Sequence, residues 1–405
     1  MLVKFPPLNR INIQEDGNSV VQLSVPSLTV KASIQSYSEG RVKGFVVAPQ
    51  DKTPSVLVIT NSARPGSGFS YALRLRIDTP SPKSGVLLDL SAGRWVTHPN
   101  ESAPLKTLAD YESHAIATKD SWHRAFDYKQ EDAAQRIEGL RPPQIGAIHA
   151  IQSHWTVSSE PATVVLPTGV GKTETMLSAL VAEQCHRLLV VVPTDVLRTQ
   201  IAEKFISLGL LKSASFQVVS NHAMYPIVGM LNRRPKDAEA VDSVFRKCNV
   251  VVTTMALAGQ CQADVIARMA EQCQYLFIDE AHHVGAPKWR EFRDSFKKSR
   301  IIQFTATPFR NDDKPVDGRR IFTFPLRKAQ EQGYFKQIRF MPVTEFNPAR
   351  KDKAIAEAAV KQLRADAPLG HILMARAANV NRAAEVFECY RKFTEFNPVQ
   401  IHTGI

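Results

Sequence analysis

The distribution of apolar residues divides the chain into regions with different periodicities. Residues 1–103 contain short runs in which apolar and polar positions tend to alternate, such as VVQLSV, VKGFVVAP and YALRLRI. Turn-forming strings such as APQDKTPS and ARPGSGFS separate these runs. Alternation of this kind is typical of half-buried strands. We therefore predict a β-rich accessory domain over residues 1–103, built as a small antiparallel sandwich or barrel.

The rest of the chain has a helical and then a mixed pattern. Residues 104–139 are polar and predict a helical linker. Over residues 140–345, amphipathic segments alternate with the apolar runs ATVVL, LLVVVP, FQVVS, NVVVTT, YLFID and IIQFTA. Continuous apolar runs are typical of a parallel sheet that is covered on both faces, so this region predicts an α/β domain. The pattern restarts over residues 346–405, where helices IAEAAVKQL and RAAEVFECYRKF and strands HILMAR and VQIHT predict the beginning of a second, incomplete α/β domain.

Bulk composition adds little to this organisation. A length of 405 residues exceeds one ordinary core, and fractions of 44% apolar and 22% charged residues are ordinary for a globular protein. The net charge of +12 favours polyanionic partners such as nucleic acid, although a solvated helix face explains part of the excess. We find no membrane span, no signal peptide and no paired cysteine spacing, and we expect a cytoplasmic protein that does not associate with a membrane.

The string LPTGVGKTET follows the predicted strand ATVVL and has the composition of a phosphate-binding loop. Gly169 and Gly171 allow successive backbone N–H groups to point at phosphate oxygens, Lys172 can reach the β- and γ-phosphates, and the hydroxyl of Thr173 can ligate Mg²⁺. Leu166 stands where the pattern usually has its first glycine. The residues predicted to bind the nucleotide here are Thr168, Gly169, Val170, Gly171, Lys172, Thr173 and Glu174.

A pair of carboxylates follows another predicted strand, YLFI, in the string DEAHH. Asp279 would hold Mg²⁺, and Glu280 would polarise the attacking water. The alternative is that the two acids only cap a helix. Because both strings follow buried strands, we expect Lys172, Thr173, Asp279 and Glu280 to meet at one edge of a parallel sheet, around ATP and Mg²⁺.

Together these motifs resemble those of superfamily 2 helicases and translocases, most closely the helicase subunits of type I and type III restriction enzymes. Further strings occur in the expected order. By resemblance, LRPPQ contributes the adenine-reading Arg141 and Gln144, and DEAHH contributes the catalytic His282. VVPTDVL and VVTTMAL contribute the nucleic-acid contacts Pro193, Thr194, Thr253 and Thr254. FTATPFR contributes Thr305 and Thr307, which couple ATP turnover to strand movement. The resemblance implies two RecA-like domains in a P-loop NTPase of the DEAH type. In this interpretation Thr305 and Thr307 can hydrogen-bond to His282 or to the carboxylates of the DEAH string. Two simpler interpretations stay open, because Thr253 and Thr254 can serve packing alone and Gln144 can simply begin a helix.

The predicted function is that of an ATP-dependent motor on nucleic acid, more specifically DNA, in a prokaryotic restriction or anti-phage defence system. A nuclease or another defence-system subunit is the expected partner. The arginine-bearing motif of the family's second domain is not found before Ile405, so we expect this chain alone to hydrolyse ATP weakly. The alternative function is an ATP-binding regulatory or scaffold subunit without unwinding activity.

Overall fold

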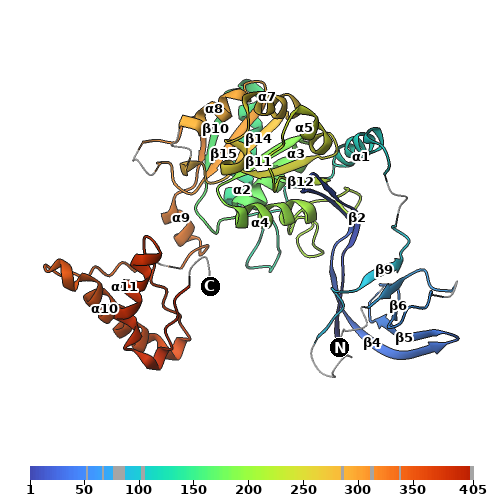
Figure 1. The fold of residues 1–405 in the computed structure, drawn as a ribbon, viewed down its shortest axis with the longest axis horizontal. Coiled ribbons are helices and arrows are strands. Elements are labelled where there is room, and N and C mark those ends of the chain that lie inside the picture. Colours follow the sequence, from blue (N-terminus) through green and yellow to red (C-terminus); the bar gives the residue numbers. More distant parts are fainter. Residues whose placement is uncertain are drawn as a thin grey trace. The chain divides into compact units, whose positions relative to one another are not determined.

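The computed structural model describes residues 1–51, 53–65, 68–75, 87–101, 105–283, 287–310, 314–336 and 339–401. The chain forms two compact units, Met1–Phe335 and Lys336–Ile405. The first unit contains two β-sheets, and the larger of them carries the predicted motifs (Figure 1). No helix of the described residues is long and apolar enough to cross a lipid bilayer.

The larger sheet has nine strands. In spatial order they are β16 (Arg319–Thr323), β10 (Ala162–Val165), β15 (Arg300–Thr305), β14 (Tyr275–Ile278), β11 (Leu188–Val192), β13 (Val250–Thr254), β12 (Val228–Met230), β3 (Asn18–Val25) and β2 (Leu8–Glu15). The seven strands from β16 to β12 run parallel to one another. The predicted α/β class with a parallel sheet is confirmed.

Helices cover both faces of this sheet (Figure 1). They are α2 (Pro142–Val157), α3 (Lys172–Ala182) and α4 (Asp195–Ser207) on one face, and α1 (Leu108–Asp120), α5 (Ala238–Phe245), α7 (Ala263–Gln272) and α8 (Pro287–Ser295) on the other, with the short α6 (Met255–Ala258) and α9 (Leu326–Glu331) in connections. Strand β11 shows why the apolar run is continuous. Leu188 and Val190 pack with the first group of helices, whereas Leu189 and Val191 pack with the second. Alternate side chains of one strand thus enter two different cores.

Two details of the predicted sheet differ from the structure. The run FQVVS forms no strand, and its Val219 makes only an isolated bridge to Phe126. The short strands β12 and β16 take places in the sheet that the sequence pattern did not predict. Strands of three to five residues carry too little periodicity to stand out from the loops around them.

The N-terminal residues contribute to both sheets, not to a separate β-rich domain as predicted. Strands β2 and β3 form a hairpin whose turn, Asp16-Gly17, has φ values of +48° and +80°. Positive φ at both positions matches the tight turns that suit the twist of paired strands, and the Asp-Gly dipeptide is a recognisable signal for them. Strand β3 pairs antiparallel with β12, which would otherwise leave its backbone groups unpaired at the sheet edge.

The smaller sheet has seven strands of mixed direction. In spatial order they are β8 (Leu87–Asp89), β1 (Leu2–Phe5), β4 (Leu28–Glu39), β5 (Val42–Pro49), β6 (Val56–Ile59), β7 (Ala72–Arg74) and β9 (Arg94–Thr97). The sheet curls so that Trp95 of its last strand, β9, donates to the carbonyl oxygen of Pro6, next to β1, at 3.1 Å. The pairs β1–β8 and β6–β7 are parallel, so the prediction that all strands of this region pair antiparallel is wrong. Gly44 is required in β5, because a Cβ atom there would lie 1.9 Å from the carbonyl oxygen of Val58.

Helix α1 lies within the predicted linker but is packed against the larger sheet. Thr107 and Asp110 form a capping box that starts it. The carbonyl oxygen of Ala115 accepts a hydrogen bond of 2.7 Å from the side chain of Asn249, which precedes β13. Glu112 makes an ion pair with Arg246 at 2.8 Å. The linker is therefore part of the first unit.

The second unit begins at Lys336, ten residues before the predicted boundary. Its two predicted helices are present as α10 (Lys351–Asp366) and α11 (Val380–Arg391), accompanied by the 3₁₀ turns Pro348–Arg350, Ala367–Leu369 and Thr394–Phe396. Neither HILMAR nor the described residues of VQIHT form a strand. A strand is stable only when it is paired with neighbours, and these two segments are not paired.

Asn249 links helix α1 to the sheet, and its replacement tests that link. Its Oδ1 atom accepts from the backbone of Ile227 at 3.0 Å, and the residue is fully buried. We expect Asn249→Ala to lower the free energy of unfolding by about 2–4 kcal/mol, because a buried donor and a buried acceptor both lose their partners. Urea denaturation measures the change, and Asn221→Ala at an exposed position is the matched control. Equal stability of the two variants would contradict the predicted link.

Candidate active site

The order of strands in the larger sheet brings the predicted motifs together. Strand β10 precedes the phosphate-binding loop, β14 precedes the DEAH string, and β15 lies between them and ends in the TAT string. Because all three strands are parallel, the three strings leave the same carboxyl edge of the sheet. Ligands of α/β proteins bind at this edge.

The phosphate-binding loop has the backbone conformation that its glycines allow. Gly169 and Gly171 have φ values of +84° and +101°, in a region that side chains with a Cβ atom disfavour. Gly171 is the N-cap of α3, and Lys172 is its first residue. Val170 is buried in the core, so only its backbone is available to a ligand. Phosphate groups are well suited to such a helix start, where free N–H groups and the helix dipole favour negative charge.

Lys172 forms a charge cluster with the two acids of the DEAH string. Its ammonium group makes an ion pair with Glu280, and its Nζ atom lies 3.9 Å from Oδ1 of Asp279. The side chains of Lys172 and Asp279 are only 9% and 7% exposed. Burial raises the pKa of Asp279 to about 6, while the Lys172 ammonium opposes this rise. The convergence of these three side chains is the central feature of the site.

Glu280 has an unusual backbone conformation. Its φ of +50° lies in the left-handed region, which costs energy in a residue other than glycine. Its N–H group donates to Oδ1 of Asp279 at 2.9 Å, which ties the two acids together. This conformation holds the carboxylate next to Lys172. Strain of this kind, supported by surrounding contacts, is typical of functional positions.

A chain of polar contacts leads from Glu280 to strand β15. Nδ1 of His282 lies 3.3 Å from Oε2 of Glu280 and 3.2 Å from Oγ1 of Thr305. Thr305 Oγ1 donates to the carbonyl oxygen of Thr307 at 2.8 Å, so its lone pairs remain available to accept from an N–H group of His282. The hydroxyl of Thr307 donates onward to the carbonyl oxygen of Phe309 at 3.1 Å. The contact between the second and third strings therefore runs through Thr305, and not through the hydroxyl of Thr307.

The side chains at this edge suit a magnesium-bound triphosphate. Oxygen donors are what Mg²⁺ prefers, and Asp279 with Thr173 would supply them. Oε2 of Glu280 is buried, and its contact among the described residues is the one with Nδ1 of His282 at 3.3 Å, so a second lone pair of this oxygen can accept from a water molecule. Lys172 supplies the positive charge that phosphate oxygens need. These residues fit Mg²⁺, which would neutralise charge on the phosphates.

Arg141 and Gln144, predicted to read adenine, both contact the phosphate-binding loop. Nη1 of Arg141 donates to the carbonyl oxygen of Gly169 at 2.6 Å, and Nε2 of Gln144 donates to that of Gly171 at 3.2 Å. Oε1 of Gln144 accepts from the backbone N–H of Arg141 at 2.7 Å. Gln144 is only 3% exposed, so it supports the loop from within the protein.

Two aromatic residues beside the loop were not among the predicted site residues. The guanidinium of Arg141 lies 4.8 Å from the ring centre of Tyr334, and the hydroxyl of Tyr334 donates to Glu131 at 2.8 Å. Burial and this hydrogen bond raise the pKa of Tyr334 to about 12. The ring of Phe335 lies 3.3 Å from the position that a Cβ atom of Gly169 would occupy. Both residues end the string PLRKAQEQGYF, which follows the TAT string in the sequence and was the signal that could have located them here.

Other predicted residues lie along the same edge but outside the charge cluster. Glu174 pairs with Lys204 of α4 at 2.8 Å. Strands β11 and β13 end next to each other, where Thr194 and Thr254 act as N-caps of α4 and α6. The exposed Thr194, with Pro193 before it, remains available for contact. Thr253 is fully buried, which favours the packing interpretation for its side chain.

Comparison with known proteins agrees with this geometry. Residues 137–310 match the family described as "Type III restriction enzyme, res subunit". Over these residues the chain is similar to that subunit. The match covers the phosphate-binding loop, the DEAH string and the TAT string, and it confirms the predicted resemblance to restriction-type helicase subunits over these residues. It extends over less than half of the chain.

Solved structures similar to this chain are distant. One is a nuclease-deletion mutant of the Type ISP restriction-modification enzyme LlaGI in complex with a DNA substrate mimic, with 16% identity over 56% of this chain and 22% of that chain and a TM-score of 0.35. Another is the UvsW helicase from bacteriophage T4, with 17% identity over 50% of this chain and 61% of that chain and a TM-score of 0.30. A third is the Pyrococcus furiosus Hef helicase domain, with 19% identity over 62% of this chain and 54% of that chain and a TM-score of 0.33. The chain spans less than two thirds of the length of each. No curated protein matches it.

The raised pKa of Asp279 predicts how stability depends on pH. The folded state holds this proton more tightly than the unfolded state, so its contribution to stability is present below pH 4 and is lost as pH rises through about 6. We expect Asp279→Asn, which carries no charge, to be more stable than the unsubstituted protein at neutral pH. The difference should shrink as pH is lowered toward 4. Thermal unfolding across this range measures it, and a difference that is independent of pH would contradict the assignment.

Proposed function

We propose that the chain is an ATP-dependent motor that moves along nucleic acid, with DNA as its substrate, in a restriction or anti-phage defence system. The observation that carries this proposal is the convergence of Lys172, Asp279 and Glu280 at the carboxyl edge of the larger sheet. The family match over residues 137–310 supports the restriction setting and, through it, the preference for DNA.

The proposed chemistry is hydrolysis of the terminal phosphate of ATP. Lys172 binds β- and γ-phosphate oxygens. Thr173 and Asp279 would hold Mg²⁺, which would neutralise charge on the phosphates. Glu280 orients a water molecule and accepts its proton as the oxygen attacks the γ-phosphorus. The bond between that phosphorus and the bridging oxygen breaks, and ADP leaves with the electron pair. When the proton is released to solvent, Glu280 is restored.

The proposed coupling runs from Glu280 through His282 to Thr305. Nδ1 of His282 lies within 3.3 Å of both neighbours, so a change in the position of Glu280 alters the hydrogen bonding of Thr305. Thr305 ends strand β15 and is bonded to Thr307, which begins the following loop. A local change at the γ-phosphate would therefore reach the loop after β15. This route uses only contacts at the sheet edge.

Substitution of Lys172 and Glu280 tests the proposed chemistry. We expect Lys172→Ala to weaken ATP binding by at least about tenfold, because it removes a charge-assisted contact. Glu280→Gln should retain ATP binding and lower turnover by about 10²–10⁴-fold, because it removes the proton acceptor. Fluorescent-nucleotide titration and phosphate release in the presence of DNA measure these effects. Lys119→Ala, at a surface ion pair on α1, is the control.

The same assays separate the motor from a regulatory subunit that only binds ATP. A motor releases phosphate faster when nucleic acid is added, and Glu280→Gln abolishes that release. A chain that binds ATP normally but shows no turnover with single-stranded or duplex nucleic acid would contradict the motor proposal. Stimulation by RNA and not by DNA would contradict the proposed substrate alone.

Thr305→Val tests the coupling route. The substitution keeps the size of the side chain and removes the hydroxyl that contacts His282 and Thr307. We expect nearly normal ATP binding and loss of most stimulation by nucleic acid, because the sheet edge no longer follows the state of Glu280. The ratio of stimulated to basal phosphate release measures the effect. Thr199→Val on α4 is the control, and an unchanged ratio in Thr305→Val would contradict the route.

A further inference from the structure

The connection between β12 and α5 carries a group of cations that no predicted motif includes. We call residues 231–237, with the sequence LNRRPKD, the Arg233 loop. Arg233, Arg234 and Lys236 are exposed, and none of them forms an ion pair with a residue that the structure describes. The single acid of the loop, Asp237, accepts from the backbone of Ala240 at 2.8 Å to cap α5. The positive charge of the loop is therefore not neutralised locally.

The N-terminal hairpin holds the start of this loop. Oδ1 of Asn18 accepts from the backbone N–H groups of Asn232 and Arg233 at 2.8 and 2.9 Å, and Asn18 is only 2% exposed. A Cβ atom on Gly17 would lie 2.8 Å from Cδ of Arg233, so the stem of that arginine rests on the glycine of the hairpin turn. More than 200 residues of sequence separate the hairpin from the loop that it orients.

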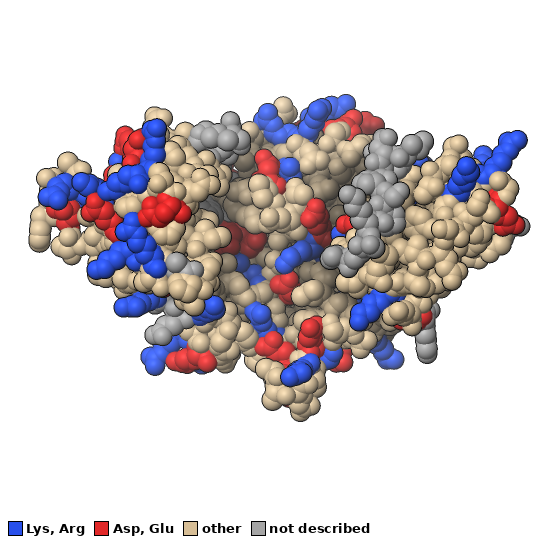
Figure 2. Space-filling model, turned by 90° about the horizontal axis from the view of Figure 1, so that it is seen from below, with Lys and Arg blue, Asp and Glu red and all other residues tan. Residues whose placement is uncertain are grey.

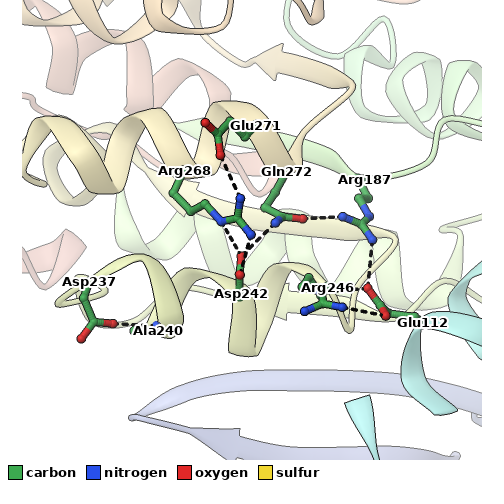
Figure 3. A network of polar contacts seen from close by, with 9 residues as sticks. All are labelled: Glu112, Arg187, Asp237, Ala240, Asp242, Arg246, Arg268, Glu271 and Gln272. Carbon is green, nitrogen blue, oxygen red and sulfur yellow. Dashed lines mark hydrogen bonds and ion pairs between the residues drawn. The ribbon is translucent and has the colours of Figure 1, made fainter. Parts of the chain in front are cut away.

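The far end of the loop is anchored through α5. The carboxylate of Asp242 accepts from Arg268 of α7 at 2.6 and 2.8 Å, and Arg246 donates to Glu112 of α1 at 2.8 and 3.0 Å (Figure 3). Gln272 bonds to Asp242 and to Arg187, and Arg187 donates to Glu112 at 3.2 Å, so these contacts join the two pairs (Figure 3). Helices α1, α5 and α7 are thus fastened to one another. The Arg233 loop is held at both ends.

The loop borders a groove at the carboxyl edge of the sheet. The groove has a volume of about 530 Å³ and lies next to the ends of β11 and β13. Its lining includes Arg198, Arg233, Arg234, Thr254 and Gln260. Arg198 is paired with Asp195 at 2.7 Å. Nη1 of Arg234 donates to the carbonyl oxygen of Gln260 at 3.4 Å, and neither Arg233 nor Arg234 forms an ion pair with a described residue. Its lining residues include no aromatic side chain, so it offers no surface for base stacking.

The charge of the Arg233 loop is a more specific signal than the charge of the face shown in Figure 2. On the face shown in Figure 2, basic and acidic side chains are interspersed and do not form one continuous positive area. The net charge of +12 therefore does not locate a polyanion by itself. Arginines that form no ion pair with a described residue, in a groove beside Thr194 and Thr254, are a more specific signal. Guanidinium groups bind phosphate oxygens in a bidentate manner.

We propose that Arg233 and Arg234 bind the phosphate backbone of a nucleic-acid strand and that Asn18, on the N-terminal hairpin, positions them. This inference rests on the proposed function, because it places the nucleic-acid strand at the carboxyl edge of the larger sheet, where the charge cluster also lies. Contacts of this type fix the position of the strand without reading its base sequence. The hairpin is then part of the motor's binding surface, in addition to completing its sheet.

Salt-dependent binding by the full chain tests the proposal. Short fluorescein-labelled single-stranded and duplex oligonucleotides are titrated at several salt concentrations and followed by fluorescence anisotropy. We expect Arg233→Ala with Arg234→Ala to weaken binding by about tenfold or more. The slope of log affinity against log salt should fall in magnitude by about 1–2, because two phosphate contacts are lost. The control is Arg41→Ala with Lys43→Ala, which removes the same charge from exposed positions at the turn between β4 and β5.

The role of Asn18 is tested by a double-mutant cycle. Asn18→Ala should weaken binding and reduce the salt slope, and adding it to the Arg233 and Arg234 substitutions should have little further effect, because the three residues act as one unit. Fluorescent-nucleotide affinity should stay unchanged in all variants, since the groove lies apart from the charge cluster. Purely additive effects would overturn the positioning role.

The two proposals fail in different ways. If the unsubstituted chain binds an oligonucleotide and the arginine variant binds like its control, the inference about the Arg233 loop is wrong and the proposed function stands. If the unsubstituted chain binds neither oligonucleotide, with and without ATP, the proposed function fails and the inference fails with it.

Discussion

The buried charge cluster of Lys172, Asp279 and Glu280 constrains the structure around it. An ionised carboxylate is costly to bury unless a cation and hydrogen bonds accompany it. Here the cation comes from the loop after β10 and the carboxylates come from the loop after β14, so the cluster forms only if these strands lie near each other and run in the same direction. The pKa of Asp279 stays raised to about 6, which shows that Lys172 compensates only part of the desolvation. Mg²⁺, held by Asp279 and Thr173, would supply the remaining positive charge.

Stability and function oppose each other at this cluster. Glu280 adopts φ of +50°, and Oε2 of its carboxylate is buried, 3.3 Å from Nδ1 of His282 and without a closer hydrogen bond from the described residues. Both features lower the stability of the free protein, and both leave the carboxylate ready to act on water. The two apolar cores on either side of the sheet provide the support that holds this conformation. The contact of His282 with Thr305 then extends the site into the neighbouring strand.

The carboxyl edge of the sheet orders the proposed functions in space. The residues proposed to bind the nucleotide follow β10 and β14, and the proposed coupling residue ends β15 between them. The residues proposed to contact nucleic acid follow β11, β13 and β12. The N-terminal hairpin continues this series by pairing with β12 and by holding the Arg233 loop. In a motor, a change at the nucleotide acts on the bound nucleic acid only if one rigid element carries both binding sites. One parallel sheet provides such an element.

Local strings were enough to predict that Lys172, Asp279 and Glu280 meet, whereas long-range strand pairing was not visible in the sequence. The glycines, Lys172 and the acid pair carry their chemistry in a few consecutive residues that follow apolar strands, so the sequence by itself determined the α/β class and the residues of the charge cluster. Only the tertiary structure decided that Gln144 bonds to the loop, that Thr253 is buried and that Asn18 orients Arg233. The physical reason is that strand alternation specifies which face of a strand is buried, while its partner depends on which sheet edge is free elsewhere in the fold.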